Sequence, residues 1–245
     1  ARHFAVSAVT IRNDLAVLRT RGALRRVHGG ARIGRTDEGG FGFRASQAPA
    51  QKRAIARLVA PTIRSGDTIA LDSSSTAYYL ARELGGREGI TVVTSALRTA
   101  MWLSDHSAAT VWLVGGVVRR ASGSTSASSL DVTNLPKRID KGFFSMNRIS
   151  AEDGLFEVSE EEAKAKRRVV SVCRQIYALA DARKFECAGE HRVVPIEAVA
   201  GIFTDSSTPS SLLDPFRARG IPLHVAYVSG DDTHAPVSSR LREVG

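Results

Sequence analysis

The chain has 245 residues, of which 43% are hydrophobic and 24% are charged, as expected of a globular protein that buries a core. No apolar run is long enough to span a membrane, and the first residues lack the apolar stretch of a signal peptide. The two cysteines form neither a metal-binding nor a disulfide pattern, so we expect a reducing, cytoplasmic setting with no metal site and no cofactor.

The net charge of +9 is concentrated at the front of the chain. Residues 1–36 contain eight arginines and a single aspartate, so this segment carries +7 of the total. Because the planar guanidinium group matches phosphate oxygens, an all-arginine segment of this kind favours contact with nucleic acid. A solvated basic tail is the alternative, but tails do not usually keep a helical spacing of apolar residues.

The spacing predicts a helix from its N-cap, Ser7, to about Thr20, with Ile11, Leu15 and Leu18 on one buried face. Polar side chains on its opening turns, followed by a basic strand or hairpin over residues 22–31, are typical of a helix that enters a DNA groove beside a cationic wing. For His28 a packed position is the alternative. We therefore expect DNA contacts from Ser7, Thr10, Arg12, Asn13, Arg25, Arg26, His28 and Gly29.

Residues 34–49 contain four glycines and show no periodicity, which predicts a linker. Helices and short apolar strands then alternate, as in a mostly parallel, doubly wound sheet. A capping box, Ser159 with Glu162, predicts a further helix, and residues 121–135 are expected to form a loop with a short helix. The expected helices are residues 50–64, 76–84 and 96–103, and the expected strands are residues 67–72, 90–94, 111–114, 177–180, 199–204 and 223–228.

Ligands of open α/β sheets bind beyond the carboxyl ends of the strands, so the residues that follow each strand are candidates for a site. These residues are hydroxyl-rich turns at helix starts (Asp72–Thr76 and Thr94–Ser95), a glycine pair (Gly115–Gly116), and Asp181 with Lys184, and Thr204–Asp205. The set suits a small phosphorylated polyol. Each has a structural alternative: the hydroxyl groups and Asp181 could cap helices, the glycines could form a turn, and Lys166 could be a solvated helix lysine.

The front segment resembles the signature of the DeoR family of bacterial transcriptional repressors. The residues that carry the resemblance are Val6-Ser7-x-x-Thr10-Ile11-Arg12-x-Asp14-Leu15 and Gly22-x-Leu24-x-Arg26-Val27-His28-Gly29-Gly30-Ala31. It extends over roughly residues 3–228 through looser motifs in the same order, which are Phe43 with Lys52-Arg53, Gly66-Asp67, Leu71-Asp72-Ser73, Val92-Val93-Thr94-Ser95, Gly115-Gly116, Asp153-Gly154-Leu155, Ala180-Asp181 and Lys184-Phe185.

The resemblance implies an α/β protein, in which a winged helix-turn-helix is joined to an effector domain similar to ribose-5-phosphate isomerase that senses a phosphorylated sugar or related metabolite. It places the effector on Asp72, Ser73, Ser74, Ser75, Thr76, Thr94, Ser95, Gly115, Gly116, Lys166, Asp181 and Lys184. Two positions depart from the family: Ser74 and Ser75 replace the usual Gly-Thr, and Ser145-Met146-Asn147-Arg148 lacks a common glycine. Arg148 could contact a phosphate or block the pocket.

The expected division is a partial winged helix-turn-helix over residues 1–33, a linker over 34–49, an effector domain over 50–228 and a disordered tail over 229–245. Family modules carry two helices before the recognition helix, so the resemblance implies that about thirty residues are missing in front. We therefore expect this front unit to be unstable alone and to bind DNA weakly, and nanomolar operator binding in a gel shift would contradict that.

The leading hypothesis is a ligand-responsive repressor of carbohydrate-metabolism genes, not an enzyme, that binds operator DNA as a homodimer or homotetramer. The alternative is a sugar-phosphate isomerase-like enzyme on the same scaffold, with Asp72, Asp140 or Asp181 as its general base. A third hypothesis, a nonspecific nucleic-acid binder, predicts indifference both to DNA sequence and to small phosphates.

Overall fold

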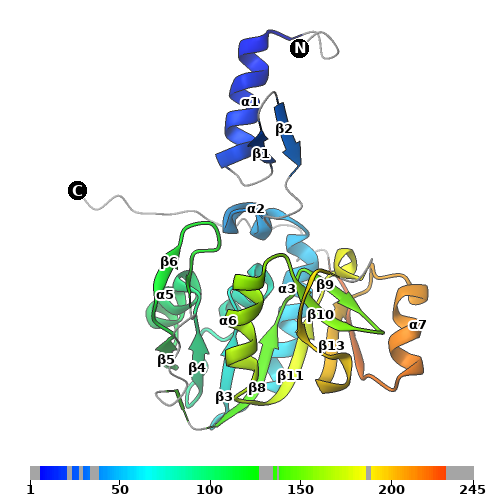
Figure 1. Cartoon of the computed structure of the whole chain (residues 1–245). Helices are drawn as coiled ribbons and strands as arrows, with labels where there is room; N and C mark the ends of the chain where they lie inside the picture. Colours follow the sequence, from blue (N-terminus) through cyan, green and yellow to red (C-terminus); the bar gives the residue numbers. More distant parts are fainter. Residues whose placement is uncertain are drawn as a thin grey trace.

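The computed structural model describes residues 6–20, 24–27, 30–33, 39–126, 135–136, 138–185 and 189–229 (Figure 1). Its first elements are the helix α1 (Ala8–Thr20) and an antiparallel hairpin of β1 (Leu24–Val27) and β2 (Gly30–Ile33). Ser7 caps α1, because its hydroxyl oxygen accepts the Thr10 N–H at 3.0 Å. The predicted helix and basic hairpin are confirmed, while His28 and Gly29 lie outside the described residues.

A seven-stranded parallel sheet forms the centre of the remaining chain (Figure 1). Strand β3 is buried over its last three residues: Ile69 and Leu71 join one hydrophobic cluster and Ala70 joins the other. This is the pattern of a parallel sheet covered on both faces. In spatial order the strands are β14 (Leu223–Ala226), β13 (Val199–Asp205), β11 (Cys173–Leu179), β8 (Ile139–Phe144), β3 (Thr68–Leu71), β4 (Thr91–Thr94) and β5 (Thr110–Leu113).

Helices supply the two hydrophobic clusters. The first cluster joins α3 (Pro49–Val59) and α4 (Ser75–Glu83) to one face of the sheet, and the second includes residues of α6 (Glu160–Val170). All six strands expected from sequence are present, and five of them lie within two residues of their predicted bounds, whereas β11 begins four residues earlier than predicted. The other helical segments are η2 (Ala60–Thr62), α5 (Leu97–His106), η4 (Ala182–Lys184), η5 (Ile196–Ala198) and α7 (Ser210–Ala218).

The segment expected to be a linker is only partly irregular. Residues 34–38 lie outside the described residues, but Phe41–Ser46 form a short helix, α2, which is a correction to the predicted linker over 34–49. The Phe41 ring meets the Tyr78 ring edge-on at 5.3 Å, and the buried Tyr79 hydroxyl donates to the Ala45 carbonyl at 3.3 Å. The glycines at 39, 40 and 42 masked the helical pattern in the sequence, and the helix is stabilised by tertiary contacts with α4.

The loop expected over residues 121–135 also differs. Its described part includes β7 (Ser124–Ser126), which forms an antiparallel hairpin with the preceding strand β6 (Val117–Arg119), and residues 127–134 lie outside the described residues. A small antiparallel sheet of β9 (Arg148–Ser150), β10 (Gly154–Glu157) and β12 (His191–Val194) was not expected either. These strands have three or four residues each, too few to show a period-2 pattern.

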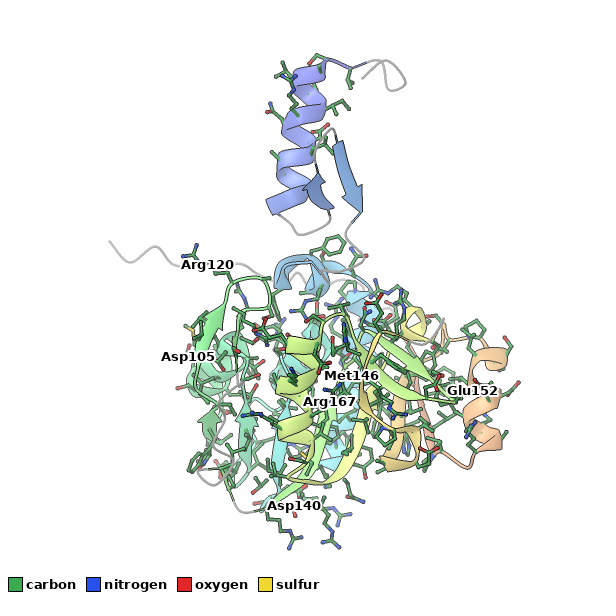
Figure 2. All side chains as sticks on the ribbon, in the orientation of Figure 1. Asp105, Arg120, Asp140, Met146, Glu152 and Arg167 are labelled. Carbon is green, nitrogen blue, oxygen red and sulfur yellow. The ribbon has the colours of Figure 1, made fainter. Side chains whose placement is uncertain are left out.

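Strand β8 was missed although it lies at the centre of the sheet, between β11 and β3. Its first half carries charge: Asp140 accepts the Thr68 N–H at 3.1 Å, and Lys141 pairs with Asp67 at 2.6 Å. These contacts lie at the amino end of the sheet, and Figure 2 shows Asp140 there, at the bottom of the view. Asp140 is therefore remote from the carboxyl ends, which corrects its proposed place among candidate general bases.

The described residues bear on three questions: the reactivity of Cys173, metal binding and membrane crossing. Burial raises the pKa of the Cys173 thiol to about 12, so this cysteine stays protonated, and it donates to the Val169 carbonyl at 3.2 Å. Among the described residues, no group of histidine, cysteine and carboxylate side chains is arranged to hold a metal ion. None of the helices that the structure describes has the length and apolar character that a membrane crossing needs.

Candidate functional site

The candidate site lies where the strand order changes direction. From β3 the chain adds β4 and β5 on one side, and then returns to add β8, β11, β13 and β14 on the other. The turn after β3 (residues 72–76) and the segment after β8 (residues 145–148) therefore diverge at the carboxyl ends of two adjacent parallel strands. In open α/β sheets such a crevice is the usual position of a ligand.

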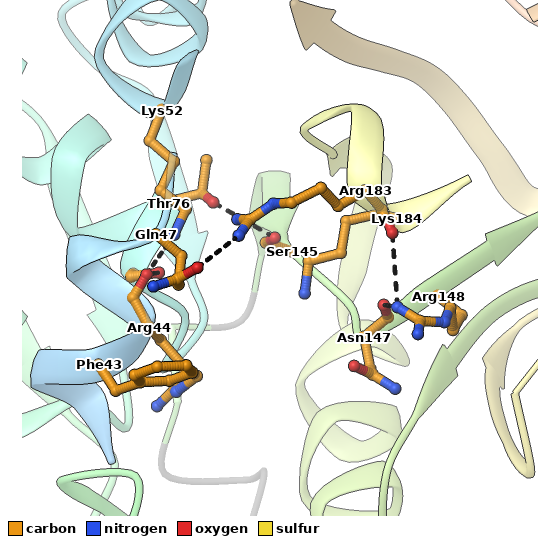
Figure 3. A pocket seen from close by; sticks show the side chains of 11 residues that line it. Phe43, Arg44, Gln47, Lys52, Thr76, Ser145, Asn147, Arg148, Arg183 and Lys184 are labelled. Carbon is orange, nitrogen blue, oxygen red and sulfur yellow. Dashed lines mark hydrogen bonds between the residues drawn. The ribbon is translucent and has the colours of Figure 1, made fainter. Parts of the chain in front are cut away.

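A pocket of about 190 Å³ opens at this crevice (Figure 3). This volume is smaller than that of a drug-sized site, which favours a small metabolite. Among the described residues, the side chains that line the pocket include five cations and no carboxylate. They are Phe43, Arg44, Gln47, Lys52, Ser75, Thr76, Ser145, Asn147, Arg148, Arg183 and Lys184. The arrangement suits an anionic ligand with hydroxyl groups.

The hydroxyl-rich turn after β3 divides into two roles. Ser74 caps α4, since its hydroxyl oxygen accepts the Ala77 N–H at 3.0 Å, so the structural alternative holds for this residue. Ser75 and Thr76 line the pocket at the start of α4, where the helix dipole favours an anion. Their hydroxyl groups contact the Arg44 carbonyl at 3.2 Å and the Ser145 hydroxyl at 3.4 Å, respectively.

Lys52, on α3, brings a buried amino group to the pocket. Its ammonium group donates to the Arg44 carbonyl, and the residue is only 3% exposed. The pKa of Lys52 is lowered to about 7, mainly by desolvation and also by the nearby cations Arg183, Lys184 and Arg44, while Asp181 acts in the opposite direction. Near neutral pH this amino group is therefore poised between its two charge states, and a bound anion would favour the protonated one.

Asp181 follows β11 by two residues and does not line the pocket. It is 1% exposed and caps η4 by accepting the Arg183 N–H at 3.2 Å, so here too the structural alternative holds. Burial opposes its ionisation, but hydrogen bonds from the Arg183 guanidinium at 2.8 and 2.9 Å outweigh burial and lower the pKa of Asp181. Asp181 thus orients Arg183, whose remaining N–H group donates to the Gln47 amide oxygen at 3.3 Å across the pocket.

A second hollow beside the first contains most of the other predicted effector residues. Asp72, Ser73, Thr94, Ser95 and Lys166 line it, but its volume of about 20 Å³ holds about one water molecule. An ion pair between Arg119 of β6 and Glu162 of α6 borders it, and Glu162 also accepts the Ser73 hydroxyl at 3.0 Å.

The Glu162 contacts also correct the predicted capping box. Ser159 does cap α6, accepting the Glu162 N–H at 3.3 Å. The Glu162 carboxylate, however, bonds Ser73 and Arg119 instead of returning to the start of its own helix. An internal carboxylate therefore occupies the Ser73 hydroxyl, one of the donors that this turn offers to an anion.

Lys166 is neither a solvated lysine nor exposed to the larger pocket. Its ammonium group lies 2.7 Å from the Asp72 carboxylate, forms an ion pair with Glu157, and donates to the Ser145 carbonyl at 3.0 Å. Asp72 in turn accepts the N–H groups of Ser74 and Ser145, at 3.1 and 3.0 Å. This buried network fixes the two segments that form the crevice, so Lys166 and Asp72 act as its support.

The glycine pair after β5 serves the β6–β7 hairpin. Gly116 has φ +136°, and a Cβ atom there would lie 2.1 Å from the Ser126 carbonyl oxygen, whereas a Cβ at Gly115 would meet nothing within 4 Å. Neither glycine lines the two hollows described above. The backbone of Gly116 closely approaches the backbone of Ser126 and not a ligand site. This favours the structural alternative for the glycine pair, a turn.

Replacing Gly116 with alanine is expected to destabilise the protein by about 2–4 kcal/mol, because the new Cβ overlaps a backbone carbonyl and the φ angle is strained. Gly115→Ala is the matched control and should change stability by less than about 1 kcal/mol. Thermal or urea unfolding of both variants measures the difference. Equal effects at the two positions would contradict this role for Gly116.

In the front unit, the structure places the polar side chains of α1 as expected. Ser7, Thr10, Arg12 and Asn13 are exposed, while Ile11 and Leu15 are half-buried. In the hairpin, Arg25 stands opposite Arg32 and Arg26 opposite Ala31 along the backbone register. The helix and the basic hairpin are thus adjacent elements, as a DNA-reading helix with a wing requires.

Sequence reasoning placed Ser75, Thr76 and Lys184 in the pocket but missed Arg44, Lys52 and Arg183. One signal was available for Lys52, because it precedes Ile55 by three residues and Val59 by seven and so falls on the buried face of α3. A lysine on an apolar helix face must bury its charge against a partner or a ligand. Arg44 and Gln47 gave no signal, since they follow glycines in a segment without periodicity.

Comparison with known proteins assigns both parts of the chain. Residues 1–36 match the family described as "DeoR-like helix-turn-helix domain", and residues 47–206 match "DeoR C terminal sensor domain". The protein "HTH-type transcriptional regulator GolR" of Listeria innocua is 33% identical over 225 residues, covering 90% of this chain and 88% of its own. The "Glycerol-3-phosphate regulon repressor" of Escherichia coli is 28% identical, with 91% and 89% covered.

Solved structures resemble the chain only in part. Ribose 5 phosphate isomerase A from Neisseria gonorrhoeae has a TM-score of 0.40 at 14% identity, covering 54% of this chain and 52% of its own. The "Probable sor Operon Regulator" from Shigella flexneri has a TM-score of 0.42 at 12% identity, covering 68% and 89%.

The matched families and the sequence relatives are transcriptional regulators, which decides against the isomerase-like enzyme. The helix with a basic wing and the sensor domain behind it are the two parts of such a regulator. This chain belongs to the DeoR family of DNA-binding transcriptional regulators.

Proposed function

We propose that this protein represses carbohydrate-metabolism genes, and that a phosphorylated sugar or related metabolite bound in the 190 Å³ pocket controls its affinity for operator DNA. The observation that carries the proposal is the lining of that pocket, in which cations and hydroxyl groups converge at the start of α4. The name of the glycerol-3-phosphate regulon repressor, a relative across nearly its whole length, supports an effector of this class.

The position of the pocket also suggests how a bound ligand would affect the DNA-binding unit. Phe43, Arg44 and Gln47, which form one of its walls, belong to α2 and the turn after it. In sequence α2 begins eight residues after β2, the last strand of the DNA-binding unit. An effector that changes the position of α2 would therefore change the constraint on that unit, which gives the two sites a physical coupling.

On the DNA side, we propose that Ser7, Thr10, Arg12 and Asn13 of α1 contact base edges and phosphates, with Arg25, Arg26, His28 and Gly29 in the wing. Because operators are read as repeated half-sites, the active species is a homodimer or homotetramer. Arg12→Ala should weaken operator binding by about 1–3 kcal/mol, with a smaller salt dependence if the contact is to a phosphate.

Two measurements test the proposed function. A thermal-shift screen against sugar phosphates should find a ligand that stabilises the protein by about 2.7 kcal/mol at 100 times its dissociation constant. A gel shift with DNA from upstream of the gene should then show a complex whose affinity that same ligand alters. Stabilisation by none of the phosphates, or DNA affinity that is indifferent to sequence and to ligand, would contradict the proposal.

A further inference from the structure

The cations of the effector pocket lie on two opposite walls. Lys52 comes from α3 and stands near Ser75 and Thr76 at the start of α4. Arg148 begins β9 and Lys184 ends η4, and both lie across the pocket from Lys52 (Figure 3). Ser145, Asn147 and Gln47 complete the lining with hydroxyl and amide groups. The pocket thus has Lys52 on one side and Arg148 and Lys184 on the other, with neutral polar groups and the Arg183 guanidinium, which donates to Gln47, between them.

The protein balances the charges on the second wall only in part, since the Asp181 carboxylate pairs directly with Arg183 at 2.8 Å and acts on Lys184 without a direct ion pair. Arg183 is offset by Asp181, but Arg148 donates only to carbonyl oxygens, those of Asn147 at 3.3 Å and Arg183 at 3.4 Å. Among the residues that the structure describes, neither Arg148 nor Lys184 forms an ion pair. Both are half-buried, so two like charges face one hollow with reduced solvation.

A ligand with one phosphate would neutralise only one of the two walls. A phosphate at the start of α4 has Lys52 and the helix N-terminus as partners, which leaves Arg148 and Lys184 facing an uncharged part of the same molecule. Covering two cations that have no direct ion-pair partner with uncharged ligand atoms would remove their water without full compensation. A second anionic group on the ligand removes this cost.

We propose, on the basis of the function proposed above, that the effector carries two anionic groups: a phosphate at Lys52, Ser75 and Thr76, and a carboxylate or second phosphate at Arg148 and Lys184. The chemical class is a phosphorylated sugar acid or a sugar bisphosphate. Hydroxyl groups of the connecting carbons meet the polar side chains between the walls. Arg148 is then a specificity-determining contact. Of the two roles that the sequence left open for it, this proposal favours contact with the ligand over blocking the pocket.

The test compares matched ligand pairs by isothermal titration calorimetry on the full chain at constant salt. One pair is erythrose 4-phosphate and 4-phosphoerythronate, and the other is fructose 6-phosphate and fructose 1,6-bisphosphate. In at least one pair, the member with the additional anionic group should bind about ten- to a hundredfold more tightly, the gain expected of one charge-assisted contact. The pair that shows the gain identifies the second group as a carboxylate or a phosphate.

Two variants locate the effect. In Arg148→Gln and in Lys184→Gln, the ratio of the two affinities within the responsive pair should fall to about threefold or less. Arg174→Gln removes an exposed cation at the opposite end of the sheet, on the first half of β11, and should keep the preference. Circular dichroism checks that each variant is folded.

The outcomes separate the two proposals. Equal affinities within both pairs, with measurable binding, would overturn the two-anion ligand and leave the phosphate-responsive regulator standing. A preference that survives both glutamine variants would overturn the assignment of Arg148 and Lys184. Absence of binding by all four phosphates, together with a negative thermal-shift screen, would overturn the effector function on which this inference rests.

Discussion

Replacing Lys166 with methionine is expected to lower the free energy of unfolding by about 3–5 kcal/mol, the cost of leaving buried charge without its partner. Lys166 is the shared cation of Asp72 and Glu157, whose side chains are 2% and 0% exposed. Its loss leaves two carboxylates close together in a buried place, where one of them must take up a proton or water must enter. Urea unfolding measures this loss, which should shift the midpoint of the transition and leave the m-value unchanged.

Two further variants make this prediction specific. Lys164→Met removes a lysine from the exposed face of the same helix, where the side chain is 67% exposed, and should cost less than about 0.5 kcal/mol. Glu157→Gln in the Lys166→Met background should recover part of the loss, because it removes one of the two uncompensated charges. A loss below about 1 kcal/mol in Lys166→Met would show that the network does not support the crevice.

The second large effect concerns Lys52 and pH. Its pKa of about 7 means that the amino group loses its proton as pH rises through neutrality. A phosphorylated ligand prefers the protonated amine, so its affinity should be highest below pH 7 and fall by at most about tenfold per pH unit above it. The second pKa of a phosphate is about 6, so the ligand keeps its charge in this window.

The charged groups around Lys52 are Arg183 and Lys184 of η4, Asp181 at the N-cap of η4, and Arg44 of α2. Lys52→Arg should therefore flatten the pH dependence, since a guanidinium group stays charged throughout. Lys52→Met should weaken binding by about ten- to a hundredfold at pH 6.5 and leave little pH dependence. Calorimetry from pH 6.5 to 8.5 measures both, and an unchanged slope in Lys52→Arg would refute the role of this lysine.

Much of the fold was predictable because local signals agree with the tertiary structure. The cap at Ser7 and the spacing of Ile11 and Leu15 predicted α1, and short apolar runs predicted β3, β4 and β13. Where local signals and tertiary contacts disagree, the prediction failed. Charged residues and a glycine in β8, and glycines before α2, are tolerated because the neighbouring strands and α4 supply partners that the local sequence does not show.

The site was predictable in position but not in composition. Parallel strands place their carboxyl ends at one edge, so Ser75, Thr76 and Lys184 could be expected together. Sequence could not show that Lys166 and Asp72 would satisfy each other, nor that Glu162 and Arg119 would close the second hollow. Whether a charged side chain binds a ligand or a neighbour depends on which groups lie within a few ångströms.

The sequence by itself determined the class of this protein: the concentration of positive charge, the capped helix with its basic wing, and the ordered motifs of a sensor domain are all properties of the linear chain. Only the tertiary structure decided which cations face the ligand. Arg44, Lys52, Arg148 and Arg183 come from four separate segments and meet only when the sheet has formed and α2 has packed on α4. The physical reason is that burial and Coulomb interactions depend on distance in space, and sequence spacing fixes such distances only within a single helix or strand.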